Sequence, residues 1–413
     1  MDNHKKYNQR MTVLNGKHIL LGVTGSIAAF KAANLASKLT QLGAQVDVIL
    51  TPAAEKFITP LTFQSVTGRR AYTDADLWGG EAHILHIGLS HTADLLVIAP
   101  CTANTISKLA YGSADNLLTI TALACECPIL IAPAMDGGMF DASVTQDNLR
   151  ILIERGVTIA GPAEGRFASG LTGKGRLLEP DQLIGHIRLV LGRNGRLADK
   201  KVLITAGGTQ EPLDPVRVIT NKSSGRQGYA LAQAGLDSGA QVILITTPTN
   251  LTAPIGVRMI EVQTAQQMYK SVLSESTKAD ILIMAAAVAD FRPKKTAKNK
   301  MKKREGIPQV ELEETEDILK AVADNKSSKK RLRVVVGFAA ESRDLLANAS
   351  DKLKSKKLDF IVANDIASSD AGFGVETNRV TLLFPNGKKE SLPLMSKAEV
   401  AEAIIEHVAA LLE

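Results

Sequence analysis

The pattern of apolar and polar positions divides the chain into two halves that begin alike. Residues 16–26 (GKHILLGVTGS) and 199–209 (DKKVLITAGGT) each place an apolar run before a glycine turn. A helical stretch follows in both halves, and then a second apolar run, GAQVDVILT at 43–51 and GAQVILITT at 239–247. Each half is therefore predicted to open with a strand, a helix and a parallel strand.

Further apolar runs indicate that each half continues as a parallel sheet, because continuous β-branched runs are typical of strands buried on both faces. These runs are DLLVIAP (94–100) and PILIAPA (128–134), then ADILIMAAAVAD (279–290), LRVVVGFAAES (332–342) and LDFIVANDI (358–366). The third run is expected to remain a strand until Asp290. Residues 378–394 instead predict a hairpin that turns at Asn386-Gly387, followed by an amphipathic helix from about Lys397.

These patterns predict an α/β fold of two doubly wound, mostly parallel sheets, the Rossmann-like arrangement. At 413 residues the chain is also long for a single hydrophobic core. The segment LGRNGRLAD (191–199) suits a linker, so the domains are expected at residues 1–192 and 193–413. Right-handed crossovers between the parallel strands give doubly wound sheets, and in such sheets ligands are expected at the carboxyl ends of the strands.

Composition narrows the class of protein. Hydrophobic residues make up 45% of the chain and aromatic residues only 4%, which is typical of an α/β enzyme and unlike a disordered chain. Cys101, Cys125 and Cys127 are too few and too clustered for a disulfide framework. No segment reaches the roughly eighteen uninterrupted apolar residues of a membrane span. A soluble, cytoplasmic protein without a membrane partner is expected.

The formal net charge of +6 is partly local, because residues 292–306 (RPKKTAKNKMKKREG) carry eight basic residues against one acidic residue. Alone, such a run is typical of a solvated loop. Binding to nucleic acid is the other interpretation, but the segment lacks interleaved aromatic residues on which bases could stack. No nucleic-acid partner is therefore expected.

The first candidate ligand loop is Gly22-Val-Thr-Gly25-Ser26, which joins a strand to a helix and so directs backbone N–H groups at an anion. It is not a G-x-G-x-x-G motif, and the second strand ends in Leu50-Thr51 without the acid that binds a dinucleotide ribose. A mononucleotide phosphate fits this loop better than NAD. A turn that only packs the strand on the helix is the alternative.

Longer motifs add a family resemblance. Residues 81–119, with H-I-x-L before A-D and an A-P-C-T-A-N turn, and PAMDGGM (133–139) resemble the flavin-dependent cysteine decarboxylases. Residues 204–232, AAAVADFRP (285–293) and VGFAAES (336–342) resemble phosphopantothenate-cysteine ligase. Together the halves are similar to the bifunctional bacterial enzymes of coenzyme A synthesis, which fuse phosphopantothenoylcysteine decarboxylase to this ligase. The resemblance implies a flavodoxin-like flavoprotein domain, a carbon-carbon lyase, followed by a carbon-nitrogen ligase domain.

For the first domain the resemblance implies FMN as the cofactor. The flavin would oxidise the thiol of 4'-phosphopantothenoylcysteine to a thioaldehyde, which accepts the electrons left by CO2, and would then reduce the resulting enethiol. The implied product is 4'-phosphopantetheine. The residues expected to contact FMN are Gly25, Ser26, Thr51, Thr102, Ala103 and Asn104.

The implied catalytic residues of this domain include two departures from the family. His86, rather than His83, matches the family's active-site histidine, which would orient the substrate carboxylate or move a proton; a metal site at E-x-H-x-x-H has no clear third ligand. Asp136 replaces an asparagine that binds the leaving carboxylate, so Asp136 is protonated or displaced, or this half is impaired. Ser169 replaces a proton-donating cysteine. A working enzyme with altered acid-base detail is expected.

For the second domain the resemblance implies that 4'-phosphopantothenate is joined to cysteine through an acyl cytidylate made from CTP with Mg2+. Arg217 and Asn221 would hold the phosphate end and stabilise the acyl oxygen, although Asn221 alone would also fit a helix cap. Lys300 would neutralise charge at the triphosphate. The expected CTP contacts are Met284, Ala285, Ala286, Asp290, Lys300, Glu316, Asp317, Ile318, Leu319, Phe338, Lys352 and Lys356.

Two other functions remain open at this point. Asp136 and Ser169 leave room for a flavin-binding regulatory or assembly module beside a working ligase. A nicotinamide oxidoreductase with two Rossmann halves is the other candidate, and bound flavin would exclude it. The resemblance also implies a homo-oligomer, with trimers that complete the FMN site, paired ligase domains and a dodecamer as the combined result.

Overall fold

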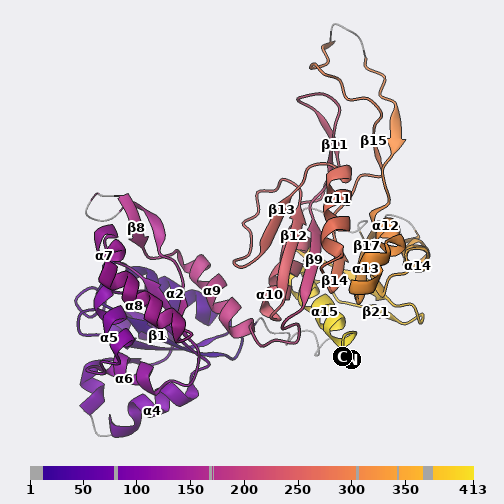
Figure 1. The fold of residues 1–413 in the computed structure, drawn as a ribbon. Helices are drawn as coiled ribbons and strands as arrows, with labels where there is room; N and C mark the ends of the chain where they lie inside the picture. Colours follow the sequence, from indigo (N-terminus) through magenta and orange to yellow (C-terminus); the bar gives the residue numbers. More distant parts are fainter. Residues whose placement is uncertain are drawn as a thin grey trace. The chain divides into compact units, whose positions relative to one another are not determined.

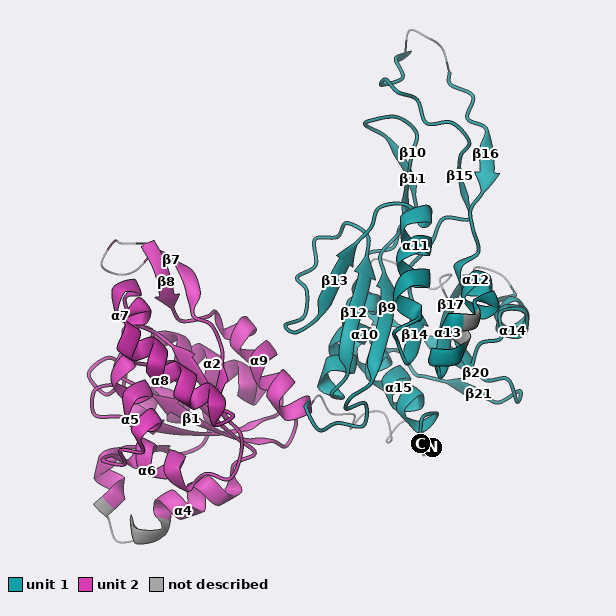
Figure 2. Ribbon diagram, in the orientation of Figure 1, with its two compact units in different colours: residues 1–10, 193–413 teal, residues 11–192 magenta. Residues whose placement is uncertain are grey.

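The computed structural model describes residues 13–78, 82–166, 170, 172–303, 307–341, 344–365 and 375–413. The chain forms two compact units that divide between Gly192 and Arg193 (Figure 2). They are the N-terminal unit and the C-terminal unit. Within the described ranges, no helix combines the length and the apolar character needed to cross a membrane.

The N-terminal unit is built on a six-stranded parallel sheet in the order β3-β2-β1-β4-β5-β6. Its strands are β1 (His18–Val23), β2 (Gln45–Leu50), β3 (Ala71–Tyr72), β4 (Leu95–Cys101), β5 (Ile129–Pro133) and β6 (Thr158–Ile159). Without the short edge strand β3, the strands lie second, first, third, fourth and fifth in chain order. This is the flavodoxin-like order, with its switch point between β1 and β4.

Helices cover both faces of this sheet (Figure 1). They are α2 (Ala29–Gln41), α3 (Pro60–Thr67), α4 (Ala82–Thr92), α5 (Ala103–Tyr111), α6 (Leu117–Ala124), α7 (Gly137–Asp141), α8 (Ser143–Glu154) and α9 (Pro180–Gly192), with a 3-10 turn at Asp74–Trp78. One core joins α2, α3 and α9 to the sheet, and a second core joins α4, α5, α6 and α8. A hairpin of β7 (Ala163–Arg166) and β8 (Thr172–Arg176) follows β6.

The C-terminal unit has an eight-stranded sheet in the order β13-β12-β9-β14-β17-β18-β20-β21. Its strands are β9 (Lys201–Ala206), β12 (Gln241–Thr246), β13 (Arg258–Glu261), β14 (Ile281–Met284), β17 (Val334–Glu341), β18 (Phe360–Asp365), β20 (Val380–Leu383) and β21 (Lys389–Ser391). Pairing is parallel from β13 to β18 and antiparallel beyond. The predicted α/β fold is confirmed, including the hairpin, where Gly387 has a φ of 82°.

The described helices of this unit are α10 (Arg226–Asp237), α11 (Ala265–Ser276), α12 (Ile318–Asp324), α13 (Lys326–Arg331), α14 (Leu345–Ser355) and α15 (Lys397–Ala410). Four of them, α11, α12, α13 and α15, begin with a side-chain cap. Thr264 and Ser396 close capping boxes before α11 and α15. The short pair β19 (Thr377–Asn378) and β22 (Met395–Ser396) precedes α15.

An arm of two paired segments extends away from the C-terminal sheet (Figure 1). One segment is the hairpin of β10 (Gln210–Pro212) and β11 (Val218–Thr220). The other is β15 (Phe291–Pro293), which pairs with β16 (Leu312–Glu314), together with the basic residues that follow β15. We call residues 210–220 and 291–303 the arm. The sequence pattern did not predict it, because strands of three residues show no periodicity.

One predicted strand is shorter than expected. The run 279–290 was expected to remain a strand until Asp290, but β14 ends at Met284. Beyond that point two N–H groups bond to buried hydroxyl groups, Ala286 N–H to Thr205 Oγ1 (3.1 Å) and Ala289 N–H to Thr209 Oγ1 (2.9 Å), and Ala287 keeps only an isolated bridge to Gly208. These bonds satisfy the peptide groups while the chain turns out of the sheet.

Candidate functional site

In the N-terminal unit, three loops meet where β1, β2 and β4 end. Thr51 N–H donates to Val23 O (3.1 Å), and Thr102 N–H donates to Thr24 Oγ1 (3.1 Å). The Thr24 hydroxyl in turn donates to Pro100 O (2.8 Å). The predicted FMN contacts Gly25, Ser26, Thr51, Thr102, Ala103 and Asn104 therefore lie on adjoining loops at one edge of the sheet.

The local structure of these loops fits a phosphate-bearing cofactor. A Cβ atom at Gly25 would lie 2.4 Å from Ala53 Cβ, so a side chain here would push the two loops apart. Thr102 occupies the N-cap of α5 in an extended conformation, and Ala103 and Asn104 begin that nine-residue helix. The first N–H groups of a helix have no partner within it and favour an anion.

Asp136 lies in a cavity of about 390 Å3 beside the glycine loop and the β7-β8 hairpin. The cavity is lined by Ser26, Ile27, Ala28, Phe30, Lys31, Ala134, Met135, Asp136, Arg166, Gly175, Arg176 and Leu177. Asp136 follows β5 and caps the short helix α7, accepting from Gly138 N–H at 3.0 Å. Met135 N–H donates to Gly175 O (2.9 Å), which ties this loop to the hairpin. Asp136 therefore shares the lining of this cavity with Arg166 and Arg176.

The other predicted catalytic residues of this unit are not all in this cavity. His86 lies on α4 and is not among the lining residues; its Nδ1 is buried and has no hydrogen-bond partner among the described residues. Such an orphaned nitrogen is expected where a ligand or partner is to bind. Ser169 lies outside the described residues, as does the side chain of His83. No cluster of three or more metal-ligating side chains occurs in the described part of the chain.

In the C-terminal unit, most of the predicted nucleotide contacts line one cavity of about 410 Å3. These are Met284, Ala286, Asp290, Glu316, Asp317, Ile318, Leu319, Phe338, Lys352 and Lys356. They come from the end of β14 and the segment that follows it, from within β17, from the start of α12 and the residues before it, and from the last turns and C-cap of α14. The structure thus brings together segments that are up to about seventy residues apart in the sequence, at the edge where parallel sheets bind ligands.

A second cavity of about 500 Å3 adjoins the first, because Asp290, Phe338 and Lys352 line both. Its wall contains Asn221 and the glycine-rich residues 222–228 at the start of α10, together with Ala285. The cap of α10 is Gly225, so Asn221 is not the helix cap that was the alternative. Instead, the Asn221 amide donates to Ala287 O at 3.2 Å and so contacts the turn after β14.

Charge in the first cavity is arranged in an ion pair. Lys356 Nζ lies 2.7 Å from Asp317 Oδ2, and the other carboxylate oxygen of Asp317 accepts from Lys320 N–H. Burial alone would raise the pKa of Asp317, but the hydrogen bonds from Lys356 and Lys320 outweigh it and lower that pKa. Asp317 therefore remains a carboxylate next to the position expected for a nucleotide.

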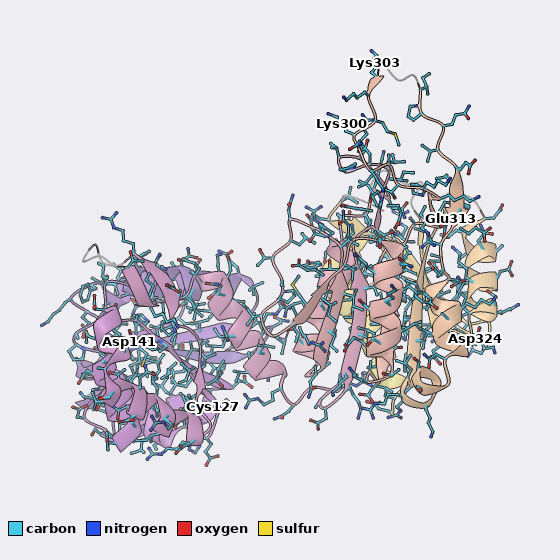
Figure 3. All side chains as sticks on the ribbon, turned by 45° about the horizontal axis from the view of Figure 1, so that its top comes forward. Cys127, Asp141, Lys300, Lys303, Glu313 and Asp324 are labelled. Atoms are coloured by element: carbon cyan, nitrogen blue, oxygen red, sulfur yellow. The ribbon has the colours of Figure 1, made fainter. Side chains whose placement is uncertain are left out.

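Arg217 and Lys300 lie elsewhere, on the arm. Neither residue lines the two cavities of its own chain. Arg217 donates through an NH2 group to Met301 O (2.7 Å), which places its guanidinium beside the residue that follows Lys300. Figure 3 shows Lys300 and Lys303 far out on the arm, away from the end of α12 at Asp324. The structure brings these two predicted residues together, but only Asn221 lines a cavity of its own chain.

Several residues that line the second cavity were missed by sequence reasoning. Asn364 at the end of β18 is only 9% exposed, and its Oδ1 has no hydrogen-bond partner among the described residues. Lys397 is 6% exposed and donates to Val375 O (2.5 Å). An isolated asparagine or lysine gives no signal in a sequence. Only the position of Asn364 at the end of an apolar run could have indicated it.

Comparisons with known proteins agree with this division of the chain. The Flavoprotein family model matches residues 8–192, and the model of the DNA/pantothenate metabolism flavoprotein C-terminal domain matches residues 197–412. The coenzyme A biosynthesis bifunctional protein CoaBC of Bacillus subtilis is 46% identical over 402 residues, which are 97% of this chain and 98% of that protein. CoaBC of Vibrio vulnificus is 42% identical over 404 residues, 97% of this chain and 100% of that protein.

Among solved structures, the C-terminal domain of a CoaBC protein is 38% identical to this chain. The match spans 53% of this chain and 98% of that domain, with a TM-score of 0.45. The matches to near-complete relatives confirm the predicted bifunctional enzyme, a decarboxylase and a ligase of coenzyme A biosynthesis, and a flavoprotein. By sequence and by domain order, this chain belongs to the family of bifunctional coenzyme A biosynthesis proteins.

Proposed function

We propose that the C-terminal unit joins 4'-phosphopantothenate to cysteine at the expense of CTP, and that the N-terminal unit decarboxylates the product with FMN. The observation that carries the ligase assignment is the pair of adjoining cavities. One cavity collects ten of the twelve residues expected to contact CTP, and the other contains Asn221. A nucleotide in the first cavity would place its phosphates toward the residues shared by both.

The ligase step would proceed in two successive reactions. The carboxylate oxygen of 4'-phosphopantothenate attacks the α-phosphorus of CTP, which forms the acyl cytidylate and releases pyrophosphate. The amine of cysteine then attacks the acyl carbon, so that the amide forms and CMP leaves. Lys352 and Lys356 would offset phosphate charge together with Mg2+ held by the phosphates, and the Asn221 amide would stabilise the acyl oxygen.

Arg217 and Lys300 would complete this site from the arm. Because neither residue lines the cavities of its own chain, the arm would serve a second copy of the ligase unit. This arrangement supports the expected pairing of ligase domains. Together with trimeric contacts between flavoprotein units, it would lead to the dodecamer expected from the resemblance.

In the N-terminal unit, FMN would bind through the loops that contain Gly25, Thr51 and Thr102. When bound, the flavin supplies a two-electron oxidation and reduction of the substrate thiol, which makes loss of CO2 feasible. The substrate carboxylate would approach Asp136, where two carboxylates repel unless one is protonated or a cation lies between them. Arg166 and Arg176 line the same cavity and would provide that cation. His86 would hold a proton near the reacting atoms.

The ligase assignment is tested by measuring CMP and pyrophosphate release from purified protein supplied with 4'-phosphopantothenate, cysteine, Mg2+ and either CTP or ATP. Release of CMP that depends on 4'-phosphopantothenate supports the proposal. Release of AMP from ATP at an equal rate would contradict the choice of CTP. The cofactor is tested by the visible absorbance of the purified protein and by release of FMN on denaturation. Protein without bound FMN would contradict the proposed cofactor. The cytoplasmic location stays a prediction.

A further inference from the structure

A buried carboxylate lies at the turn of the β10-β11 hairpin, on the arm. The side chain of Asp214 is fully enclosed, whereas that of Arg217, three residues further on, is 45% exposed. Asp214 Oδ1 accepts from Val216 N–H and from Arg217 N–H, each at 2.8 Å. These two bonds fix the turn from which the Arg217 side chain emerges.

The second carboxylate oxygen reaches the basic segment of the arm. Asp214 Oδ2 accepts from Met301 N–H (3.2 Å), and Arg217 donates to Met301 O (2.7 Å). The hairpin thus holds both the N–H and the C=O group of one residue. That residue directly follows Lys300, so the backbone that presents Lys300 is held by Asp214 and Arg217 together.

Two further bonds align this segment along the hairpin. Thr296 Oγ1 donates to Pro212 O (3.1 Å), and Ala297 N–H donates to Leu213 O (3.0 Å). Residues 294–303 contain several lysines, whose mutual repulsion favours an extended, detached chain. Hydrogen bonds to the hairpin backbone and one buried negative charge oppose this repulsion. Asp214 provides that charge and accepts the hydrogen bond from Met301 N–H.

We infer that Asp214 is a positioning residue of the ligase reaction, which sets Arg217 and Lys300 at a defined separation on the arm. This inference rests on the proposed function, because it assumes that Arg217 and Lys300 act in the ligase step. An aspartate suits the role because its three hydrogen bonds all come from backbone N–H donors, Arg217 Nε lies 3.7 Å from Oδ2, and an ionised carboxylate accepts at both oxygens. Hydrogen bonds from Val216, Met301 and Arg217 oppose its burial and lower the pKa of Asp214, which keeps it ionised.

The test is Asp214→Asn in the full-length protein. An asparagine that keeps its oxygen toward Val216 and Arg217 turns its NH2 group toward Met301 N–H, so two donors face each other and the segment is released. We expect the kcat for formation of 4'-phosphopantothenoylcysteine to fall about 10- to 100-fold, the usual cost of a misplaced group. The KM for cysteine should change little. Amide hydrogen exchange should accelerate in residues 295–303.

A double-mutant cycle distinguishes positioning from a general structural role. Asp214→Asn keeps the bonds to Val216 N–H and Arg217 N–H and loses only the bond to Met301 N–H, so its effect should run through Lys300. Combined with Lys300→Gln it should therefore be no slower than Lys300→Gln alone. Asp280→Asn is the matched control, because Asp280 is also buried and accepts a backbone hydrogen bond, from Lys201 N–H at 2.9 Å, but lies away from the arm. It should leave kcat unchanged even where it lowers the melting temperature.

A second variant covers the case in which Asp214→Asn does not fold. Thr296→Val keeps the side-chain shape at an exposed position of the arm but removes the donor to Pro212 O. It should give a smaller loss of kcat that is again absent in the Lys300→Gln background. Wild-type kcat in Asp214→Asn would overturn the positioning role of Asp214 but leave the proposed ligase function in place. Effects that multiply with those of Lys300→Gln would do the same. An unaffected rate in Lys300→Gln would overturn the role proposed for Lys300 as well.

Discussion

The ammonium group of Lys356 lies 2.7 Å from a carboxylate oxygen of Asp317, and both residues line the predicted nucleotide cavity. Lys356→Gln would leave the charge of Asp317 without this partner, facing the triphosphate. We expect the KM for CTP to rise about fivefold, which corresponds to ~1 kcal/mol for a partly exposed pair. Steady-state kinetics of the ligase reaction at saturating cysteine measure this change.

Removing the second charge should restore part of the affinity. In Lys356→Gln combined with Asp317→Asn the repulsive carboxylate is gone, so the KM for CTP should be lower than in Lys356→Gln alone. Lys354→Gln is the control, because Lys354 lies in the last turn of α14, two residues before its C-cap Lys356, but is exposed and outside the cavity. A double variant with a higher KM than Lys356→Gln would contradict the role given to this ion pair.

Asp136→Asn tests the most unusual residue of the decarboxylase cavity. Removing the negative charge near the substrate carboxylate should leave decarboxylation unchanged or accelerate it, because an amide can donate to that carboxylate. The helix cap should survive, since asparagine caps as well as aspartate. CO2 release from 4'-phosphopantothenoylcysteine measures the effect, and Asp141→Asn at the other end of α7 is the charge-matched control. A tenfold loss restricted to Asp136→Asn would show that the carboxylate itself is required.

Gly25→Ala tests the proposed cofactor loops. The added methyl group would lie 2.4 Å from Ala53 Cβ, so the loops after β1 and β2 must separate. We expect most of the bound flavin to be lost, measured as visible absorbance per mole of purified protein. Gly88→Ala is the matched control, because no atom of the described residues lies within 4 Å of its added methyl group. Full flavin occupancy in Gly25→Ala would argue against these loops as the cofactor site.

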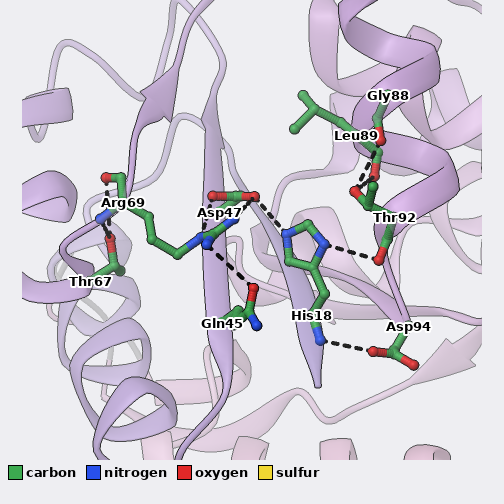
Figure 4. Close-up of polar contacts among 9 residues, drawn as sticks. All are labelled: His18, Gln45, Asp47, Thr67, Arg69, Gly88, Leu89, Thr92 and Asp94. Atoms are coloured by element: carbon green, nitrogen blue, oxygen red, sulfur yellow. Dashed lines mark hydrogen bonds and ion pairs between the residues drawn. The ribbon is translucent and has the colours of Figure 1, made fainter. Parts of the chain in front are cut away.

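A buried charge cluster at the opposite end of the first sheet predicts how stability depends on pH (Figure 4). Asp47 in β2 lies 2.5 Å from His18 Nε2 and accepts from Arg69 Nε at 2.7 Å. Burial alone would raise the pKa of Asp47, but the bonds from His18 and Arg69 lower it to about 2. The hydrogen bond with Asp47 is the largest influence on His18 and raises its pKa above the usual 6.5.

Because the folded state raises the pKa of His18, the stabilisation by its proton is complete below pH 6.5 and is lost as pH rises through the folded value. The unfolding free energy of the N-terminal unit should fall over this range by at most about 1.4 kcal/mol per pH unit. His18→Gln should remove this dependence. Denaturant unfolding followed by Trp78, the single tryptophan of the chain, measures it. An equal slope in both proteins would contradict the prediction.

The fold was predictable because its signals are local. The apolar runs before Gly25 and before Gly207 predicted strands that the structure contains as β1 and β9. The grouping of Met284 with Lys356 was implied by the family resemblance, and both residues line one cavity. By contrast, the run 279–290 was misjudged, because the hydroxyl groups that turn it out of the sheet come from residues about eighty positions earlier.

The arm was unpredictable for the same physical reason. Asp214 and Met301 are 87 residues apart, and nothing near either residue indicates that they bond. Lys300 was found through family resemblance, but the sequence could not place it outside the cavities of its own chain. Burial of a charged residue such as Asp214 is determined by tertiary contacts, and a composition of charged and apolar residues alone does not reveal it.

The most direct test of the central claim is mass spectrometry of the products formed from 4'-phosphopantothenate, cysteine, CTP and Mg2+ by the purified protein. The account predicts 4'-phosphopantetheine, with CMP, pyrophosphate and CO2 in equal amounts. Products that stop at 4'-phosphopantothenoylcysteine in protein with bound FMN would contradict it. The ligase assignment would then stand, and the flavoprotein unit, with Asp136 and Ser169 in place of the family residues, would have a regulatory or assembly role instead.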